Sequence, residues 1–252
     1  MEKRSNPTTA YAALIITAAG SSRRMGAGEK KEYRSLNGRP VLVQTLLPFL
    51  QSGLFSQVVI TIPPGHGERV ESLLQQLPQE FHNWIEKIIL IEGGASRQAS
   101  VFAGLEACSC NPRFVLIHDG ARPRTSAMLI RRVLFDTEEN GASIPVVAST
   151  DAMKQITSDG FIQAHLPRQA TVCAQTPQGF AFQEILSAHR QAENERDDFI
   201  DDAEVYARYI GRVHTVEGEK ENLKLTYPDD FHIHAGPNLQ PTPHSGSPGD
   251  HL

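Results

Sequence analysis

Short apolar runs alternate with segments of helical periodicity along most of the chain, and this alternation is the feature that most constrains the fold. Five apolar runs have the length and composition of buried strands: 14–16, 57–62, 87–91, 113–117 and 142–147. Helical spacing follows four of them, at 40–51, 67–76, 97–107 and 126–139. This order is typical of βαβ units and a parallel sheet. We therefore predict an α/β, Rossmann-like fold in which the loops after the strands gather at one edge, where ligands of open α/β sheets bind.

The remainder of the chain is expected to complete one domain over 12–235. Helices are predicted at 182–192 and 201–210, and a last strand at 218–226. Pro48 lies inside the first helical segment and is expected to kink or shorten it. Residues 1–11 are expected to be a flexible leader. Pro, Gly, Ser and His prevail in 236–252, which predicts a disordered tail.

Residues 149–175, which we call the arm, interrupt the alternation. Short segments flank Ser158-Asp159-Gly160, a sequence suited to a hairpin turn, and no long helix separates them. We expect a projecting β-arm beside a mainly parallel sheet. Because a lone hairpin cannot bury its own faces, such an arm usually packs against another chain, and we predict a homodimer.

Composition excludes several classes of partner. The chain has 252 residues, is 40% hydrophobic and carries a net charge of −5, which argues against nucleic acid or an anionic membrane as the main partner. No apolar run approaches the roughly 20 residues that span a bilayer, and the leader has no apolar core typical of a secretion signal. The three cysteines cannot all pair and form no zinc-like array, so we expect a reducing, cytoplasmic location.

The stretch 14–33, LIITAAGSSRRMGAGEKKEY, joins a buried strand to a loop of small residues and fixed cations. Small side chains at Ala18, Ala19 and Gly20 let a ligand lie against backbone N–H groups. Arg24 and Lys31 then supply positive charge. We predict that this loop binds a nucleoside triphosphate. A solvated turn with basic residues remains an alternative for the loop by itself, because it matches neither the P-loop nor the G-x-G-x-x-G pattern.

Two later strand-end loops carry matching chemistry. In the sequence GGASRQAS, Gly94 precedes Arg97 and Ser100 at the start of a helix, where N–H groups and a hydroxyl can meet a polar ligand. Arginine opposes the helix dipole in a first turn, which favours a functional reason for Arg97. A plain strand–helix turn is the competing interpretation.

In the sequence HDGARP, Asp119 follows a buried strand and suits a magnesium ion held by triphosphate oxygens. Arg122 can clamp a phosphate. An internal ion pair between Asp119 and Arg122 is the alternative, and His118 is expected to be structural.

Two further positions are open to either interpretation. Asp201-Asp202 begins a predicted helix, so capping is the default role and a site role is an alternative. Lys224 lies between Leu223 and Leu225 and should point either to the site or to solvent.

These motifs, in this order, resemble those of the 2-C-methyl-D-erythritol 4-phosphate cytidylyltransferase family of the non-mevalonate isoprenoid pathway. The resemblance covers about 14–231 and rests on AAGSSRRMG with KKEY, GGASRQAS, HDGARP, DAMK, TPQGF, DDA and ENLKLTYPDD. It implies a nucleotidyltransferase domain whose β-arm interlocks two subunits, with CTP and Mg²⁺ used and pyrophosphate released.

The resemblance also implies roles for individual residues. CTP would be held by Ala18, Ala19, Gly20, Gly94, Arg97 and Ser100. Arg24 and Lys31 would stabilise the transition state. The sugar phosphate or the metal would contact Asp119, Gly120, Arg122, Thr176 and Lys224. Arg168, from the partner's arm, would position that phosphate beside Lys224.

The chain departs from the family pattern at two positions that bear on the choice of alcohol. Ala152 and Ile200 stand where the family often has threonine, and each lost hydroxyl is worth about 1 kcal/mol of hydrogen bonding. A ribitol 5-phosphate cytidylyltransferase on the same scaffold is therefore one alternative. A catalytically silent nucleotide-binding protein is another.

Overall fold

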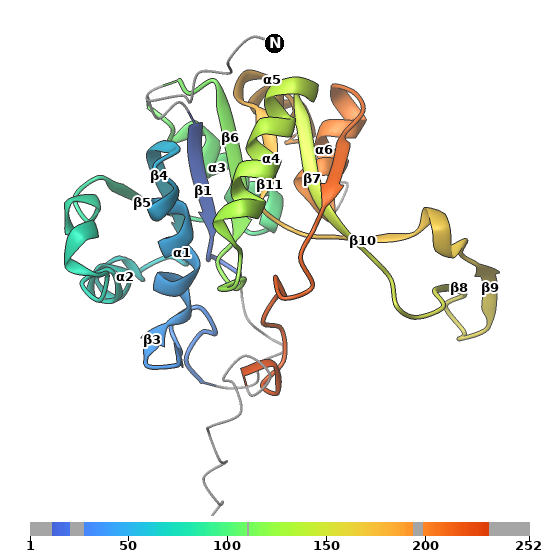
Figure 1. Ribbon diagram of the computed structural model, residues 1–252, viewed down its shortest axis with the longest axis horizontal. Helices are drawn as coiled ribbons and strands as arrows, with labels where there is room; N and C mark the ends of the chain where they lie inside the picture. The colour runs from blue at the N-terminus through green and yellow to red at the C-terminus, as the bar shows by residue number, and fades with distance from the viewer. Residues whose placement is uncertain (1–11, 21–27, 110, 194–198, 232–252) are drawn as a thin grey trace, which may run out of the picture.

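The computed structural model describes residues 12–20, 28–109, 111–193 and 199–231. Its main sheet runs in the order β10-β7-β11-β6-β1-β4-β5, with β12 paired to β7 (Figure 1). The strands of this sheet are β1 (Ala12–Thr17), β4 (Phe55–Ile62), β5 (Ile88–Glu92), β6 (Phe114–Asp119), β7 (Ala142–Ala148), β10 (Val172–Ala174), β11 (Gln178–Ala181) and β12 (His214–Glu217). Two further pairs are β2 (Ser35–Leu36) with β3 (Arg39–Pro40), and β8 (Lys154–Ile156) with β9 (Ile162–His165).

The sheet is mostly parallel, which confirms the predicted α/β class. Strand β1 pairs in parallel with β4 and β6, β4 with β5, and β7 with β12. Strand β11 lies antiparallel between β6 and β7, and β10 is antiparallel to β7 at the edge. The sequence pattern did not predict β11.

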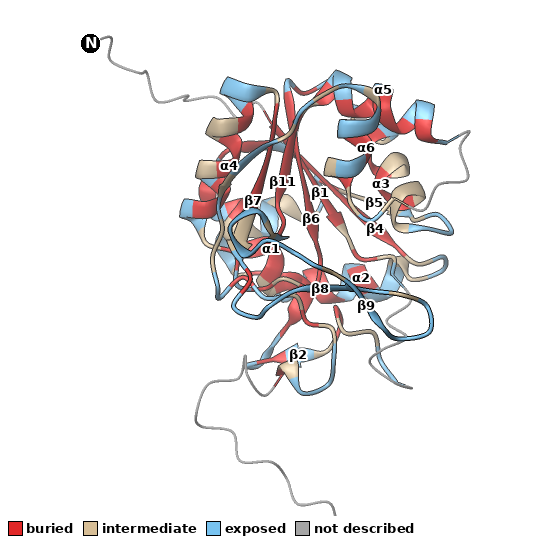
Figure 2. Cartoon of the chain, turned by 90° about the vertical axis from the view of Figure 1, so that its right-hand side faces the viewer, coloured by how far each residue is buried: buried red, intermediate tan, exposed pale blue. Residues whose placement is uncertain are grey.

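Helices cover both faces of the sheet. They are α1 (Val41–Ser52), α2 (Gly67–Leu74), α3 (Arg97–Glu106), α4 (Ala127–Asn140), α5 (Phe182–Ala192) and α6 (Asp202–Tyr209), with 3₁₀ turns at Gln79–Trp84 and Arg168–Ala170. Side chains alternate along β1, so Leu14 and Ile16 share one core with α1, α2 and α4. Ala13 and Ile15 share the other core with α3, α5 and α6. Figure 2 shows the buried sheet between these layers.

Two local predictions need correction. Pro48 does not shorten helix α1, which continues to Ser52 because Leu46, Phe49 and Leu50 keep that turn anchored in the core, while the kink stays a prediction. The last strand is β12, and 218–226 is a loop. Gly218 donates its N–H to the Val146 carbonyl at 2.8 Å, and the next residues bond to the Gln175 side chain instead of a neighbouring strand.

Strands β8 and β9 form an antiparallel hairpin that projects from the body of the molecule (Figure 1). The turn contains Gly160 with φ of 92°, a conformation that favours glycine. The last part of the arm, β10, instead belongs to the main sheet. Within the described ranges, no helix combines the length and apolarity that a membrane crossing requires. The predicted leader and tail, 1–11 and 236–252, lie outside the described residues.

Candidate active site

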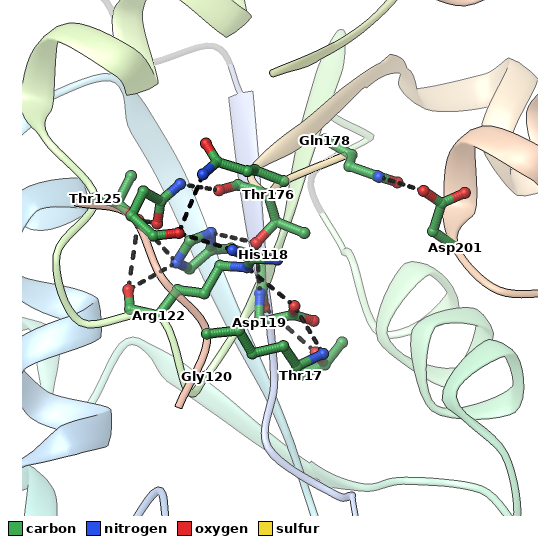
Figure 3. Close-up of polar contacts among 12 residues, drawn as sticks. Thr17, His118, Asp119, Gly120, Arg122, Thr125, Thr176, Gln178 and Asp201 are labelled. Atoms are coloured by element: carbon green, nitrogen blue, oxygen red, sulfur yellow. Dashed lines mark hydrogen bonds and ion pairs between the residues drawn. The ribbon is translucent and has the colours of Figure 1, made fainter. Parts of the chain in front are cut away.

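Asp119, the last residue of β6, lies at the centre of a group of cationic side chains, of which Figure 3 labels Arg122. Its Oδ2 atom is 2.9 Å from Lys224 Nζ and 3.3 Å from Arg122 Nε. Its Oδ1 atom is 3.7 Å from Arg97 Nε. Burial alone would raise the pKa of the Asp119 carboxyl, but the three cations outweigh burial and hold this pKa well below its usual range. We call these four residues the Asp119 cluster.

Backbone packing at the end of β6 fixes the position of the cluster. Asp119 is the Cα partner of Thr17, the last residue of β1. Gly120 then turns back and donates its N–H to the Thr17 carbonyl at 2.9 Å. A Cβ at Gly120 would lie 3.0 Å from that carbonyl oxygen, so a larger residue would push the two strand ends apart. The ends of β1 and β6 can therefore lie this close only because residue 120 is glycine.

His118 supports the cluster from behind through a continuous hydrogen-bond path (Figure 3). Complete burial lowers the pKa of His118 to about 3, so the ring is neutral. Its Nε2 lies 3.2 Å from the Arg122 carbonyl, which can only accept, so Nε2 carries the proton. Nδ1 then accepts from the Thr176 hydroxyl at 2.9 Å, whose oxygen accepts the Asp119 N–H at 3.1 Å. These contacts agree with the structural role predicted for His118.

Two glycine-containing loops meet beside the cluster. A Cβ at Gly93 would lie 2.3 Å from Ala19 Cβ and 2.7 Å from Ser100 Oγ. The loops after β1 and β5 are therefore in contact, which places Ala19 near the start of α3. Ser96 caps that helix by accepting the Ala99 N–H at 3.0 Å, and Ser100 donates to the Ser96 carbonyl at 2.8 Å.

Arg97, in the first turn of α3, spans two buried carboxylates. Its Nη2 donates to Asp202 Oδ2 at 2.7 Å, while its Nε faces Asp119. Burial would lower the pKa of Arg97, but Asp202 and Asp119 outweigh it and raise this pKa. The two carboxylates explain why an arginine is stable at the positive end of a helix dipole.

The family model for 2-C-methyl-D-erythritol 4-phosphate cytidylyltransferase matches residues 12–235. The chain belongs to this family. The resemblance seen in the sequence motifs is thus confirmed.

Curated proteins related to this chain match most of its sequence. A protein named bifunctional enzyme IspD/IspF from Rhodopseudomonas palustris is 43% identical over 229 residues, which is 89% of this chain and 55% of that protein. One of the same name from Nitrobacter winogradskyi is 41% identical over 228 residues, with 89% and 55% covered. The chain therefore spans about half the length of the curated relatives it matches.

Solved structures of the cytidylyltransferase family match in fold. The 2-C-methyl-D-erythritol 4-phosphate cytidylyltransferase from Thermus thermophilus is 31% identical with a TM-score of 0.70, over 88% of this chain and 96% of that one. The 4-diphosphocytidyl-2C-methyl-D-erythritol synthase from Anaerococcus prevotii is 26% identical with a TM-score of 0.76, over 89% and 96%.

The structure brings most of the residues expected from the cytidylyltransferase motifs to one edge of the sheet. Thr176 and Gly120 flank Asp119, and Lys224 points into the site. Lys31 Nζ donates to the Leu225 carbonyl at 2.9 Å, so Lys31 lies beside the segment that carries Lys224.

Of the two remaining residues expected to be catalytic, Arg24 lies outside the described residues. Arg168 is exposed on the arm, where its Nη2 donates to the Thr150 carbonyl at 3.4 Å. This contact of Arg168 lies within the arm, which projects from the body of the molecule (Figure 1).

Sequence reasoning missed several polar residues that support the site. Asn222 is fully buried, donates to the Thr176 carbonyl at 2.8 Å and accepts from the Thr125 hydroxyl at 2.9 Å. Gln178 joins the site to α6: it donates to Asp201 Oδ2 at 2.8 Å and accepts the Asp202 N–H at 3.1 Å (Figure 3). The only hint of these supporting residues in the sequence was Asn222, a polar residue inside a segment that we expected to be a strand.

The two aspartates of the DDA motif have different roles. Asp201 caps α6 by accepting the Glu204 N–H at 3.0 Å, as the default interpretation predicted. Asp202 is fully buried and holds Arg97. Among the described residues, no group of three or more His, Cys, Asp or Glu side chains could hold a metal ion by itself.

Proposed function

We propose that this protein transfers CMP from CTP to 2-C-methyl-D-erythritol 4-phosphate and releases pyrophosphate. The observation that carries the proposal is the Asp119 cluster, in which an ionised carboxylate holds three cations at the carboxyl edge of the sheet. Membership of the cytidylyltransferase family supports the reaction.

The reaction needs positioning and charge stabilisation more than covalent chemistry. A phosphate oxygen of the sugar alcohol attacks the α-phosphorus of CTP, and no protein nucleophile is required. Lys224 and Arg122 would exchange part of their contact with Asp119 for the incoming phosphate. Asp119 keeps both cations in place until then, because an unpaired cation in a half-buried site would otherwise turn to solvent.

The nucleotide would lie along the loops after β1 and β5. Ala18, Ala19, Gly20 and Gly94 offer backbone at close approach, and a Cβ at Gly94 would lie 2.5 Å from Ala99 Cβ. Arg97 and Ser100 would contact CTP from the first turns of α3. Arg24 and Lys31 would stabilise the charge that develops on the α-phosphate.

Magnesium fits this site as an ion brought in with the triphosphate. Mg²⁺ commonly takes one or two carboxylates and fills its remaining positions with phosphate oxygens and water. Asp119 is ionised, and among the described residues its Oδ1 is approached by Arg97 Nε alone, at 3.7 Å, so this oxygen would serve as the protein ligand. The ion would neutralise charge on the phosphates.

We further propose a homodimer formed through the arm. Exposed apolar side chains gather on it: Ile156, Phe161, Ile162, Leu166 and Val172. Pairing would bury them and carry Arg168 toward the partner's Lys224. The exposed Cys173 thiol in this region fits a reducing, cytoplasmic compartment.

A two-substrate assay tests the proposal. CTP-dependent pyrophosphate release is measured with 2-C-methyl-D-erythritol 4-phosphate and, in parallel, with ribitol 5-phosphate. We expect the first substrate to give the higher kcat/KM. A preference for ribitol 5-phosphate would assign the alternative activity, and CTP binding without turnover of either substrate would indicate a silent nucleotide-binding protein.

A further inference from the structure

His189 is a buried histidine on α5 that core packing alone does not explain. Its side chain has no exposed surface, and its ring stacks parallel to Phe102 with centroids 6.5 Å apart. Neither ring nitrogen has a hydrogen-bond partner within the described part of the chain. The other inward positions of α5 are mostly apolar, Ile185 and Ala188 among them. A buried polar group without a partner lowers stability, so an aliphatic residue would serve folding better here.

His189 faces the Asp202 carboxylate on the side away from Arg97. Its Nε2 lies 3.3 Å from Asp202 Oδ1, although the contact misses strict hydrogen-bond geometry. Burial would raise the pKa of the Asp202 carboxyl, but Arg97 and His189 together outweigh burial and lower this pKa. The other oxygen of Asp202 binds Arg97 at 2.7 Å. The carboxylate therefore lies between a guanidinium on its site side and an imidazole on its core side.

Arg97 takes its orientation from Asp202 rather than from Asp119. The contact with Asp202 is a short hydrogen bond at 2.7 Å, whereas Asp119 is 3.7 Å away. Both contacts use Nε and Nη2, and Nη1 has no partner among the described residues. The Arg97 side chain is 26% exposed, so a ligand can reach part of it.

We infer that His189 is a positioning residue, which fixes the Asp202 carboxylate and through it the direction in which Arg97 meets the nucleotide. His189 touches no substrate. Its Nε2, 3.3 Å from Asp202 Oδ1, gives this buried oxygen a polar neighbour where it has no other partner among the described residues, and this contact keeps the carboxylate from rotating. The inference rests on the proposed function, because it assigns Arg97 to CTP.

The test compares His189→Phe, which keeps the ring against Phe102 but removes the nitrogens, with His189→Gln, which restores a polar nitrogen. We expect His189→Phe to weaken CTP binding, measured by calorimetry, and to raise the KM for CTP by about tenfold. The KM for the sugar phosphate should stay within about twofold, and His189→Gln should recover most of the loss. Ile185→Val, on the same helix, is the control for stability and should leave both constants unchanged.

Asp202→Asn keeps the inference testable if His189→Phe does not fold. Acting through the same arginine, it should raise the KM for CTP selectively, and combining it with His189→Gln should add little. The inference is overturned if CTP affinity in His189→Phe is unchanged, or if both KM values rise equally. Absence of turnover in the unmodified enzyme would count against the proposed function instead, while calorimetry with CTP would still test the role of His189.

Discussion

The Asp119 cluster and the hairpin of β8 and β9 differ in how many of their side chains are buried and paired within a single chain. Around Asp119, buried His118, Thr176 and Asn222 form a network whose members bond to one another. On the hairpin, Ile156, Phe161 and Ile162 are among the most exposed apolar side chains described (Figure 2). The buried side chains of the first region find their partners within the same chain, and the hairpin presents apolar side chains that no described residue covers.

This difference separates two kinds of requirement. A cluster in which one carboxylate orients three cations must be preorganised by buried partners, because exposure to water would weaken its interactions and let the side chains adopt many orientations. An exposed apolar hairpin costs the single chain little and gains stability only when a second surface covers it. Substitutions in the Asp119 cluster should therefore lower the stability or activity of a single chain. Substitutions in the hairpin should instead weaken the association of two chains.

The largest effect on stability is expected from Asp119→Asn. It removes the charge that holds three buried or half-buried cations and leaves them facing one another. We expect the free energy of unfolding, measured in urea, to fall by about 3 kcal/mol. Asp159→Asn is the control, since this carboxylate is exposed in the hairpin turn, and it should change stability by only a few tenths of a kcal/mol. A loss below about 1 kcal/mol for Asp119→Asn would show that the cations do not depend on this carboxylate.

Lys31→Ala should retain the fold and lose turnover. Removing one preorganised donor typically lowers kcat by about 10²–10³, or roughly 3–4 kcal/mol in activation free energy. Steady-state kinetics with both substrates measures the loss, and circular dichroism checks the fold. Lys87→Ala, an exposed lysine at the opposite end of β5, should be near normal. Near-normal activity of Lys31→Ala would remove Lys31 from the mechanism.

Acid should weaken the network behind the cluster through His118. The folded pKa of about 3 lies below the ordinary value near 6.5, so the unfolded chain binds the proton first as pH falls. The contribution of His118 to stability is complete above about pH 6.5 and declines by about 1.4 kcal/mol per unit down to pH 3. Between pH 7 and pH 5 we expect a loss of about 2 kcal/mol in unfolding free energy. His118→Gln should lack this part of the slope, and an unchanged slope would contradict the buried, neutral ring.

The smallest effect on single-chain stability is expected in the arm. Phe161→Ser should change the unfolding free energy of dilute, monomeric protein by less than about 0.5 kcal/mol. It should nevertheless weaken self-association, measured by sedimentation over a range of concentrations. Met128→Ser on α4 is the control, because both side chains are 71% exposed, and it should leave association unchanged. Equal effects of both variants would show that the arm is not the interface.

The sequence was sufficient to predict the residues at the edge of the sheet. Gly20, Gly94 and Asp119 each follow an apolar run, and parallel strands end on the same side, so their convergence follows from local pattern and chain direction. Lys224 was expected to face the site or solvent, and it reaches Asp119 even though its segment is a loop.

The sequence could not predict which distant segments complete the site. Strand β11 has four residues and lies between β6 and β7 by antiparallel pairing that no local periodicity encodes. The ion pair between Arg97 and Asp202 joins residues 105 positions apart. Asn222 is buried only because the loop after β12 folds over Thr176. Such contacts depend on the assembled sheet, and single-sequence patterns carry little information about them.

The pairing of β7 with β10 has a consequence for protein engineering. Ala148 and Val172, at the two ends of the projecting segment, are Cα partners in this ladder. A short turn joining them would excise the hairpin and leave the flanking strands in register, whereas a cut beyond Ala174 would release Thr176 from His118. The sheet thus marks the two positions at which the hairpin could be replaced while the strands stay in register, and a replacement would have to supply an arginine in place of Arg168.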